Sequence, residues 1–361
     1  MTTRTLLATS ALALGLASGT AAQEITVLGW GGAYTNSQVK AFHEPFTAAT
    51  GIRVISVDAD NPATPIKAMV EANNVTVDVA SIEYADAVRM CDEGLLEPID
   101  PASLPPAPDG TPAVDDFLPG TLTECMAGTD VFATIYAYDT TKFAGDPPAT
   151  IADFFDLQRF PGKRGVRRGA KATLEMALMG DGVPADQVYA VLGTPEGVDR
   201  AFAKLDTIKS EIVWWQAGSQ PPQLLADGEV VMTIAWNGRI FNAAVGEGKP
   251  FAIVWDGQVY EPEGYAMPRG TPNKDAAMQF IAFATSTEPL ARAAEWISYG
   301  PTRRSSAPLV GVFQIDGKTP MPPNLPTSPE NLTNALFSSY EFWVDYDAEL
   351  NERFNAWLLA N

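Results

Sequence analysis

Apolar and polar residues in the N-terminal part of the chain follow a pattern that predicts alternating strands and helices. Apolar runs rich in β-branched residues predict strands at Glu24–Gly29, Ile52–Val57 and Val75–Ile82. Between them, apolar residues at helical spacing predict helices, one ending near Gly51 and one spanning Ile66–Ala72. Strands that alternate with helices pack as a parallel α/β sheet, and the polar or aromatic residues at their ends predict a ligand site along one edge.

A segment in the second half of the chain contains a short and almost wholly apolar run. Val230–Ala235 is typical of a strand covered on both faces, and Trp236 follows at its end. A second apolar run at Phe251–Trp255 predicts another strand, with a turn at Asp256 and Gly257. Aromatic and acidic residues then alternate, at Tyr260, Glu261, Glu263 and Tyr265.

Two interpretations of this second segment are open. An aromatic face beside a carboxylate suits a bound ammonium, which gains cation–π attraction and a charge-assisted hydrogen bond. Alternatively, Trp236 and Trp255 are core residues and the glutamates form a solvated rim.

Residues 1–22 have the three parts of a secretory signal peptide. Arg4 gives a positive start, Leu6–Ala17 is an apolar core, and Thr20-Ala21-Ala22 is a small-residue cleavage site. We therefore expect an exported, periplasmic protein that begins at Gln23. No later segment approaches the roughly 20 apolar residues of a membrane-spanning helix.

Export also bears on the two cysteines of the chain, Cys91 and Cys125. An oxidising compartment allows them to form a disulfide, and two free buried thiols are the alternative.

Composition narrows the classes of function. With 46% hydrophobic residues and 8 tryptophans the chain can bury substantial cores, and a formal charge of −20 excludes a general nucleic-acid binder. The only histidine, His43, lies among polar neighbours, where we expect a solvated side chain. A single histidine gives little support to a Ser-His-Asp arrangement or a histidine metal cluster. No phosphate-binding or nucleophile motif is present, and we expect no metal and no cofactor. These absences make an enzyme less expected but do not exclude a carboxylate-based glycosidase, whose acid pair has no fixed spacing.

Several short motifs, in their order and spacing, resemble the periplasmic solute-binding proteins of ABC importers, in the spermidine/putrescine-binding group. The resemblance covers essentially the whole chain after the signal peptide. The motifs include Trp30-Gly-Gly-Ala-Tyr34, Asp78-Val-Ala-Ser81, Glu93-Gly-Leu-Leu-Glu-Pro-Ile-Asp100, Ala235-Trp-Asn-Gly238 and Tyr299-Gly-Pro-Thr302.

The resemblance implies a type II-like periplasmic-binding-protein fold, with two α/β lobes joined by crossing strands and a ligand cleft between them. It implies one lobe from residues 23–138 and 264–305, and a second from residues 139–263 and 306–361. Members of the group catalyse no reaction and pass their solute to a membrane permease. We expect a monomer, and a role in chemotaxis in place of transport stays open.

The same resemblance implies the residues that line the cleft. Aromatic walls fall on Trp30 or Tyr34, and on Tyr84, Trp236 and Tyr299. The hydrogen-bonding serine falls on Ser219, and the carboxylate that binds an amine falls on Glu263. Glu83, at the end of the third predicted strand, is our own candidate for a further counter-charge.

The chain departs from the group at a basic segment that contains Arg167, Arg168 and Lys171, where spermidine binders carry two acids. A basic group in the cleft would repel a polyamine but would suit a zwitterion, whose carboxylate an arginine can bind. If the segment covers the outer surface of its lobe, it has no effect on the ligand.

The sequence therefore predicts a receptor for a polyamine or a related small amine, with a γ-amino acid as the alternative ligand. Within the same class Fe(III), thiamine-like cations and sugars are rival ligands, although Tyr136 and Tyr138 fit a wall or core better than an iron site. An exported hydrolase that uses Glu83 and Glu263 as its carboxylate pair is the alternative from a different class.

Overall fold

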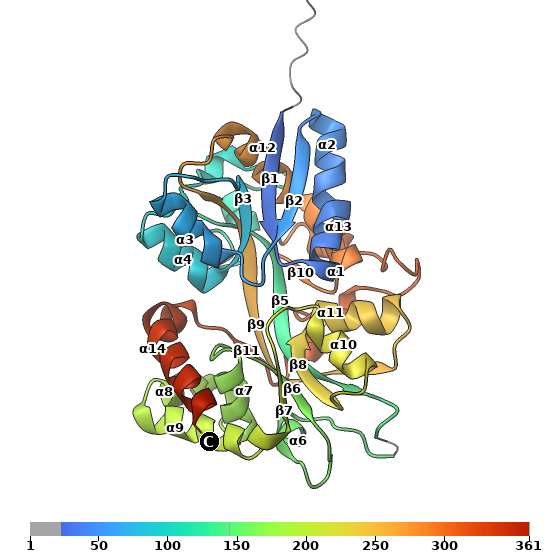
Figure 1. Cartoon of the computed structure of the whole chain (residues 1–361). Coiled ribbons are helices and arrows are strands. Elements are labelled where there is room, and N and C mark those ends of the chain that lie inside the picture. The colour runs from blue at the N-terminus through green and yellow to red at the C-terminus, as the bar shows by residue number, and fades with distance from the viewer. Residues whose placement is uncertain (1–22, 144, 361) are drawn as a thin grey trace, which may run out of the picture.

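The computed structural model describes residues 23–143 and 145–360, and Figure 1 shows two lobes with strands running between them. The predicted signal peptide lies outside the described residues. Within those two ranges, no helix combines the length and the apolar character that a membrane span requires.

Each lobe is built around parallel strands. The first lobe, at the top of Figure 1, contains β1 (Glu24–Gly29), β2 (Arg53–Asp58) and β3 (Val79–Glu83). The second lobe contains β6, β7 and β8, at Arg164–Arg167, Ile212–Trp215 and Met232–Trp236. Within a lobe, β1 pairs in parallel with β2 and β3, and β6 pairs in parallel with β7 and β8.

Two long strands connect the lobes. These are β5 (Ala127–Asp139) and β9 (Phe251–Pro268), which pair with each other in antiparallel orientation along most of their length. The sheet order is β2-β1-β3-β9-β5-β8-β6-β7, so the two crossing strands lie at its centre. The predicted two-lobed α/β fold with crossing strands is confirmed.

Helices cover the sheet in both lobes (Figure 1). Helices of the first lobe are α1 (Gly32–Gln38), a π-helix (Val39–His43), α2 (Glu44–Thr50), α3 (Ala63–Glu71), α4 (Tyr84–Asp92), α12 (Lys274–Ala284) and α13 (Thr287–Trp296). Helices between β5 and β9 are α6 (Ile151–Phe155), α7 (Thr173–Gly180), α8 (Val188–Leu192), α9 (Pro195–Asp206), α10 (Gln220–Ala226) and α11 (Asn237–Phe241). The last helix is α14 (Tyr340–Leu359). Short elements are α5 (Ala113–Asp116), β4 (Leu96–Glu97), β10 (Gly300–Pro301) and β11 (Leu336–Phe337). The predicted residue boundaries between the lobes stay a prediction.

The predicted turn at Asp256 and Gly257 is wrong, because β9 continues through both residues. The pairing with β5 shifts register between Thr134 and Tyr136, opposite this point, so the turn formers accommodate an irregularity within one strand. Gly257 has a φ of +76°, which favours glycine, and its N–H donates to the carbonyl of Asn334.

The predicted solvated position of His43 is also wrong. Its side chain is buried, its Nδ1 lies 2.9 Å from the hydroxyl of Ser56, and its ring packs edge-on against Phe280. Burial lowers the pKa of His43 to about 4, so the imidazole is neutral at pH 7. The polar residues beside it in sequence lie on other faces of the helix, which is why local composition gave the wrong environment.

The predicted disulfide between Cys91 and Cys125 is present. It joins the last turn of α4 to the segment that leads into β5.

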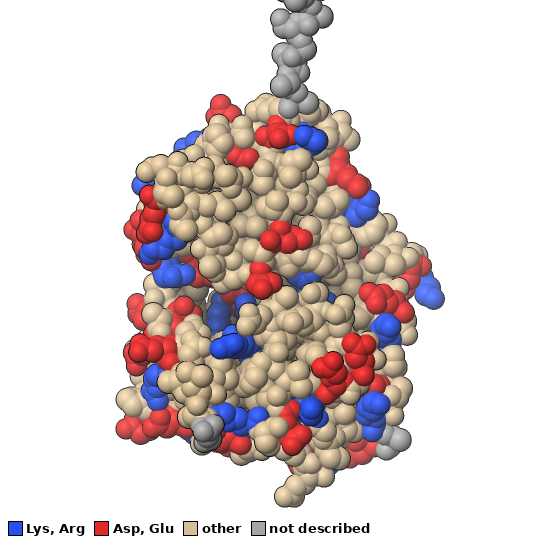
Figure 2. All heavy atoms as spheres, viewed as in Figure 1, with Lys and Arg blue, Asp and Glu red and all other residues tan. Residues whose placement is uncertain are grey.

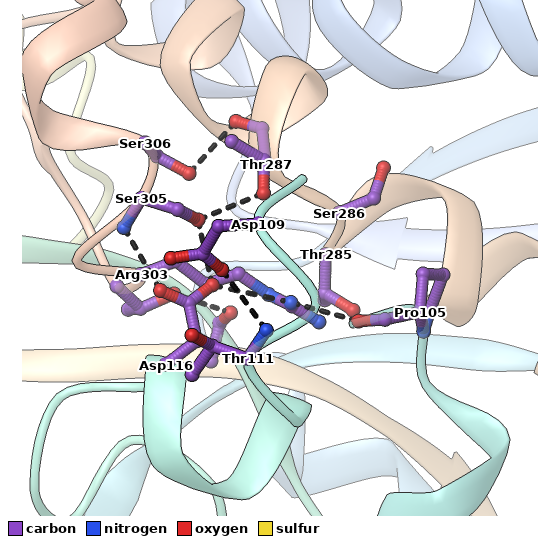
Figure 3. A network of polar contacts seen from close by, with 12 residues as sticks. Pro105, Asp109, Thr111, Asp116, Thr285, Ser286, Thr287, Arg303, Ser305 and Ser306 are labelled. Carbon is purple, nitrogen blue, oxygen red and sulfur yellow. Dashed lines mark hydrogen bonds and ion pairs between the residues drawn. The ribbon is translucent and has the colours of Figure 1, made fainter. Parts of the chain in front are cut away.

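A buried ion pair fastens the loop before β5 to the chain after β10 (Figure 3). Nη1 of Arg303 donates to Asp116 Oδ2 over 3.3 Å and to the carbonyl of Pro105 over 2.8 Å. The backbone N–H and the hydroxyl of Ser305 donate to the same carboxylate over 2.9 and 2.6 Å. Both charged side chains are almost fully shielded from water, and the guanidinium also lies over the ring of Phe117. The pair therefore holds the loop before β5 against the segment after β10, although the two are far apart in sequence.

Substitution of Asp116 by alanine is expected to lower the free energy of unfolding by about 3–5 kcal/mol, because it leaves the buried Arg303 without its carboxylate. Chemical denaturation of the two proteins measures the difference. The matched control is Asp115→Ala, since Asp115 is the exposed neighbour in the same helix and should change stability by less than about 0.5 kcal/mol. Equal effects of the two substitutions would contradict a special role of the pair.

Candidate functional site

A small cavity lies between the lobes, where the strands of both lobes end. It is narrow, because only about 10 Å³ of it is open to the centre of a water-sized molecule. Its lining comes from the residue after β1, from α1, β3, β5, β8, α11 and β9, and from the segment after α13. In this order the lining residues are Trp30, Tyr34, Glu83, Phe132, Trp236, Arg239, Glu263 and Tyr299. Six of the eight predicted site residues therefore meet in one place.

Aromatic rings form most of the cavity wall. Trp236 contacts Trp30 and Phe132 edge-to-face, with ring centroids 5.5 and 6.3 Å apart. Tyr299 contacts Tyr34 and Phe132 at 6.1 and 5.9 Å. All five side chains are buried. Such a wall can enclose an apolar stem and present ring faces to a cation.

Three carboxylates form a row on one face of the sheet beside this wall. Glu263 of β9 lies opposite Glu83 of β3 and opposite Asp130 of β5 in the strand register. Because directly opposed residues of paired strands point to the same face, the three side chains are neighbours. Glu263 is only 3% exposed and Asp130 is 4% exposed.

Asp130 and Glu263 lack a cationic partner among the described residues. The hydroxyls of Thr129 and Tyr34 lie 3.0 and 3.5 Å from Asp130 Oδ2, and Asp130 Oδ1 is buried without a hydrogen-bond partner there. Burial raises the pKa of Asp130 to about 7. Burial and the charge of Asp130 also raise the pKa of Glu263 well above its ordinary value. The two acids therefore favour either a bound proton or a bound cation.

Arg239 supplies a buried positive charge to the same cavity. It lies on α11, three residues after Trp236, and is 3% exposed. Its guanidinium donates to the carbonyls of Gly31 and Trp30, while its Nε is buried without a partner in the described part of the chain. No carboxylate of residues 23–143 or 145–360 forms an ion pair with it. Arg239 is thus available to bind an anionic group.

The basic segment, which the sequence left open, faces the cleft. Lys171 Nζ lies 2.9 Å from Glu83 Oε2 and 2.5 Å from Glu261 Oε2. Arg167 lies over the ring of Trp236 at 4.9 Å, and its Nη1 is 3.8 Å from Glu83 Oε1. Burial opposes the ionisation of Glu83, but Lys171 and Arg167 outweigh it and hold the pKa of Glu83 below its ordinary value.

Outside this ion pair the cleft widens toward solvent. A larger hollow is lined by Glu83, Lys171 and Arg168 together with polar residues of α3, α4 and α14. Figure 2 shows basic side chains gathered in the groove between the two lobes. Glu83 lines both the inner cavity and the outer hollow, so it stands at the boundary between them.

Two predicted site residues do not line the inner cavity. Tyr84 begins α4 immediately after Glu83, and its ring packs against Tyr340 with centroids 4.4 Å apart. Ser219 is exposed at the start of α10 and lines a separate hollow together with Arg239. Their predicted role in ligand binding stays a prediction.

Sequence reasoning missed three residues of the site, which are Arg239, Asp130 and Phe132. A signal for Arg239 was present, because a residue three positions after Trp236 lies on the same side of the helix that follows the strand. Asp130 and Phe132 could be assigned only from the register between β5 and β9. No group of three or more potential metal ligands is found among the described residues.

Comparisons with known proteins agree with this architecture. The profile of a family described as bacterial extracellular solute-binding protein matches residues 41–327, which is more than half of the chain. A protein of Pseudomonas aeruginosa described as a gamma-aminobutyric acid-binding protein is 46% identical over 346 residues, covering 96% of this chain and 94% of that protein.

Solved structures show the same fold. The periplasmic binding protein MotA of Agrobacterium tumefaciens in complex with glucopine has a TM-score of 0.84 at 28% identity, covering 93% of this chain and 100% of that one. A structure described as a GABA receptor has a TM-score of 0.77 at 33% identity, covering 94% and 98%. The spermidine/putrescine-binding protein PotD of Streptococcus pneumoniae has a TM-score of 0.67 at 16% identity, covering 93% and 99%, a likeness that shows the fold alone.

The family match, the close relative and the two-lobed structure lead to the same conclusion. The chain belongs to the bacterial extracellular solute-binding protein family, and it is a solute-binding receptor of an ABC importer.

Proposed function

We propose that the protein captures a γ-amino acid of the size and charge of γ-aminobutyric acid. One observation carries this proposal: the aromatic inner cavity is lined by Arg239 and by Glu263, which lies beside Asp130, and among the described residues none of these three buried groups forms an ion pair. A zwitterion with its charges at opposite ends supplies both missing partners at once.

The acidic pair suits the ammonium of such a ligand. Glu263 and Asp130 are adjacent and buried, so their shared negative charge is poorly solvated until a cation arrives. The rings of Trp236, Tyr34 and Tyr299 surround the same space and add cation–π attraction.

Arg239 suits the carboxylate. Two of its donors are held by backbone carbonyls of residues 30 and 31, which fixes the direction of the guanidinium before a ligand binds. A fixed arginine binds a carboxylate through geometry that a flexible lysine does not offer. The walls formed by Phe132 and Trp236 can then pack against the methylene stem.

The alternative, a polyamine such as putrescine or spermidine, fits this charge arrangement less well. The second ammonium of a polyamine would approach Arg239, and like charges in a desolvated site repel strongly. The relative that is 46% identical is described as binding gamma-aminobutyric acid, which supports the same choice.

The remaining predictions fit a transport receptor. We propose that the protein acts as a monomer in the periplasm, where it passes its ligand to a membrane permease and catalyses no reaction. The hydrolase alternative would use Glu83 and Glu263 as acid and base, but Lys171 already binds Glu83. Turnover of a panel of glycosides would identify a hydrolase.

Isothermal titration with γ-aminobutyric acid and putrescine tests the assignment of the two charged ends. Arg239→Gln is expected to weaken γ-aminobutyric acid binding by at least about 30-fold, since it removes the partner of a buried carboxylate. It should not weaken putrescine binding, because putrescine has no carboxylate. Glu263→Gln should weaken the binding of every ligand that carries an ammonium.

The control for these variants is Arg53→Gln, which removes an exposed arginine that pairs with Glu24 and should leave affinity unchanged. Equal loss of both ligands in Arg239→Gln would contradict the carboxylate assignment. Failure of the wild-type protein to bind any amino acid or amine would reject the proposed ligand class.

Ligand affinity is expected to fall as the pH drops from 8 to 6. The pKa of Asp130 is raised to about 7 by burial, so at lower pH the acidic pair holds a proton that a bound ammonium must displace. Affinity should therefore fall by up to about tenfold per pH unit below 7. Titration across this range, in buffers of different ionisation enthalpy, measures both the affinity and the proton released.

Two acids on the same face share this pH dependence. Burial and the charge of Asp130 raise the pKa of Glu263 well above its ordinary value, and burial raises the pKa of Glu261 to about 8. Tyr34 has a pKa raised by burial, and His43 has a pKa lowered to about 4, so neither titrates between pH 6 and 8. Asp130→Asn should flatten the profile, and an unchanged slope in that variant would assign the proton to another group.

A further inference from the structure

We propose that Lys171 acts as a built-in ammonium, which occupies a second cation site next to the ligand cavity and so restricts the receptor to ligands with one ammonium. This inference rests on the proposed function and deepens it, because it concerns how the same site rejects diamines.

The contacts of Lys171 are those expected of a bound ammonium. Its Nζ lies 2.9 Å from Glu83 Oε2 and 2.5 Å from Glu261 Oε2, and its side chain is only 14% exposed. Glu83 ends β3 in the first lobe, whereas Lys171 follows β6 in the second lobe, so the ammonium arrives from across the cleft. Glu261 lies on β9 between the two.

The carboxylates that Lys171 neutralises adjoin the ones left for the ligand. Glu261 and Glu263 are two residues apart on β9, so they point to the same face and are separated by about 7 Å. Glu83 lies opposite Glu263 in the register and lines the ligand cavity. The face thus offers two acidic sites at a spacing that a short diamine can span, and the protein fills one of them itself.

The backbone beside Lys171 is held in an unusual conformation. Ala172 has a φ of +63°, one of two non-glycine residues with positive φ in the described ranges. Such a conformation persists only where surrounding contacts enforce it. The N–H of Ala170 donates to Asn351 of α14, which fixes the loop from the other side. The loop is therefore built to direct Lys171 toward the two glutamates.

A purely structural role for Lys171 predicts a different outcome. If the lysine only joined the lobes, its loss would weaken all ligands alike and would not change the preference between them. If it fills a cation site, its loss should open that site to a second ammonium of the ligand.

The test replaces Lys171 by methionine, which keeps the length of the side chain and removes the charge. Calorimetric titration compares γ-aminobutyric acid, putrescine and cadaverine in the wild-type protein and in Lys171→Met. We expect the variant to bind at least one of the two diamines 100-fold or more tightly than the wild-type protein does. Lys171→Arg is the matched control, since it keeps a cation at this position and should keep diamines out.

A second measurement asks whether the vacated site accepts a free cation. Ethylammonium chloride should bind to Lys171→Met already saturated with γ-aminobutyric acid but not to the saturated wild-type protein, and sodium chloride at the same concentration should bind to neither. If Lys171→Met does not fold, as judged by circular dichroism, the double variant Lys171→Met with Glu261→Gln reduces the unpaired charge and is titrated in the same way. We expect a smaller gain in diamine affinity from this double variant, because only Glu83 is left to bind the second ammonium.

The outcomes separate the two proposals. Failure of the wild-type protein to bind γ-amino acids would overturn the proposed function. Wild-type binding of γ-aminobutyric acid together with no gain in diamine affinity, in either the single or the double variant, would overturn the role of Lys171 alone. Tight binding of putrescine by the wild-type protein would overturn it as well.

Discussion

The structure depends on the burial of negative charge between the lobes. Glu83, Glu261, Glu263 and Asp130 lie on one face of the sheet, and each is 5% exposed or less. Carboxylates this close and this dry cannot all stay ionised without cations nearby. The second lobe supplies some of these cations as Lys171 and Arg167, and we infer that the ligand supplies another. Closure of the lobes and binding of the ligand then have the same effect, since each brings a cation to the buried carboxylates.

This arrangement explains why the acids lie on the crossing strands. Because β5 and β9 connect the lobes, their central residues stay in the gap whatever the angle between the lobes. A carboxylate there can be solvated when the lobes separate and desolvated when they approach. The free energy gained when a cation neutralises such a carboxylate therefore stabilises the closed form directly, without a conformational change in the core of either lobe. Hinge-joined receptors need such a coupling, since a ligand can stabilise closure only through interactions that differ between the open and closed forms.

Sequence reasoning was most reliable where a feature is local. The strands that end at Trp30, Glu83 and Trp236 were recognisable from apolar runs, and their ends meet at the cavity because parallel strands share an edge. The path of β9 was not recognisable, because Asp256 and Gly257 favour a turn unless β5 pairs across them. The same long-range pairing brings Asp130 beside Glu263, which no spacing in the sequence indicates. Tyr84 and Ser219 do not line the inner cavity, since Tyr84 packs against Tyr340 and Ser219 lines a separate hollow, and their role in ligand binding stays a prediction.

Ligand choice in such a site follows from the balance of charge more than from the fold. Two lobes, crossing strands and an aromatic wall can enclose many small amines, because cation–π contacts and packing do not distinguish one ammonium from two. Ligands with one ammonium are distinguished from those with two by the number of carboxylates that the protein itself has neutralised. They are also distinguished by whether the end of the cavity away from the acids carries a positive side chain. Lys171 and Arg239 set these two conditions, and they lie on different elements that can vary independently. A change at either position would therefore alter ligand choice without altering the architecture, which is how one fold can serve receptors with different ligands.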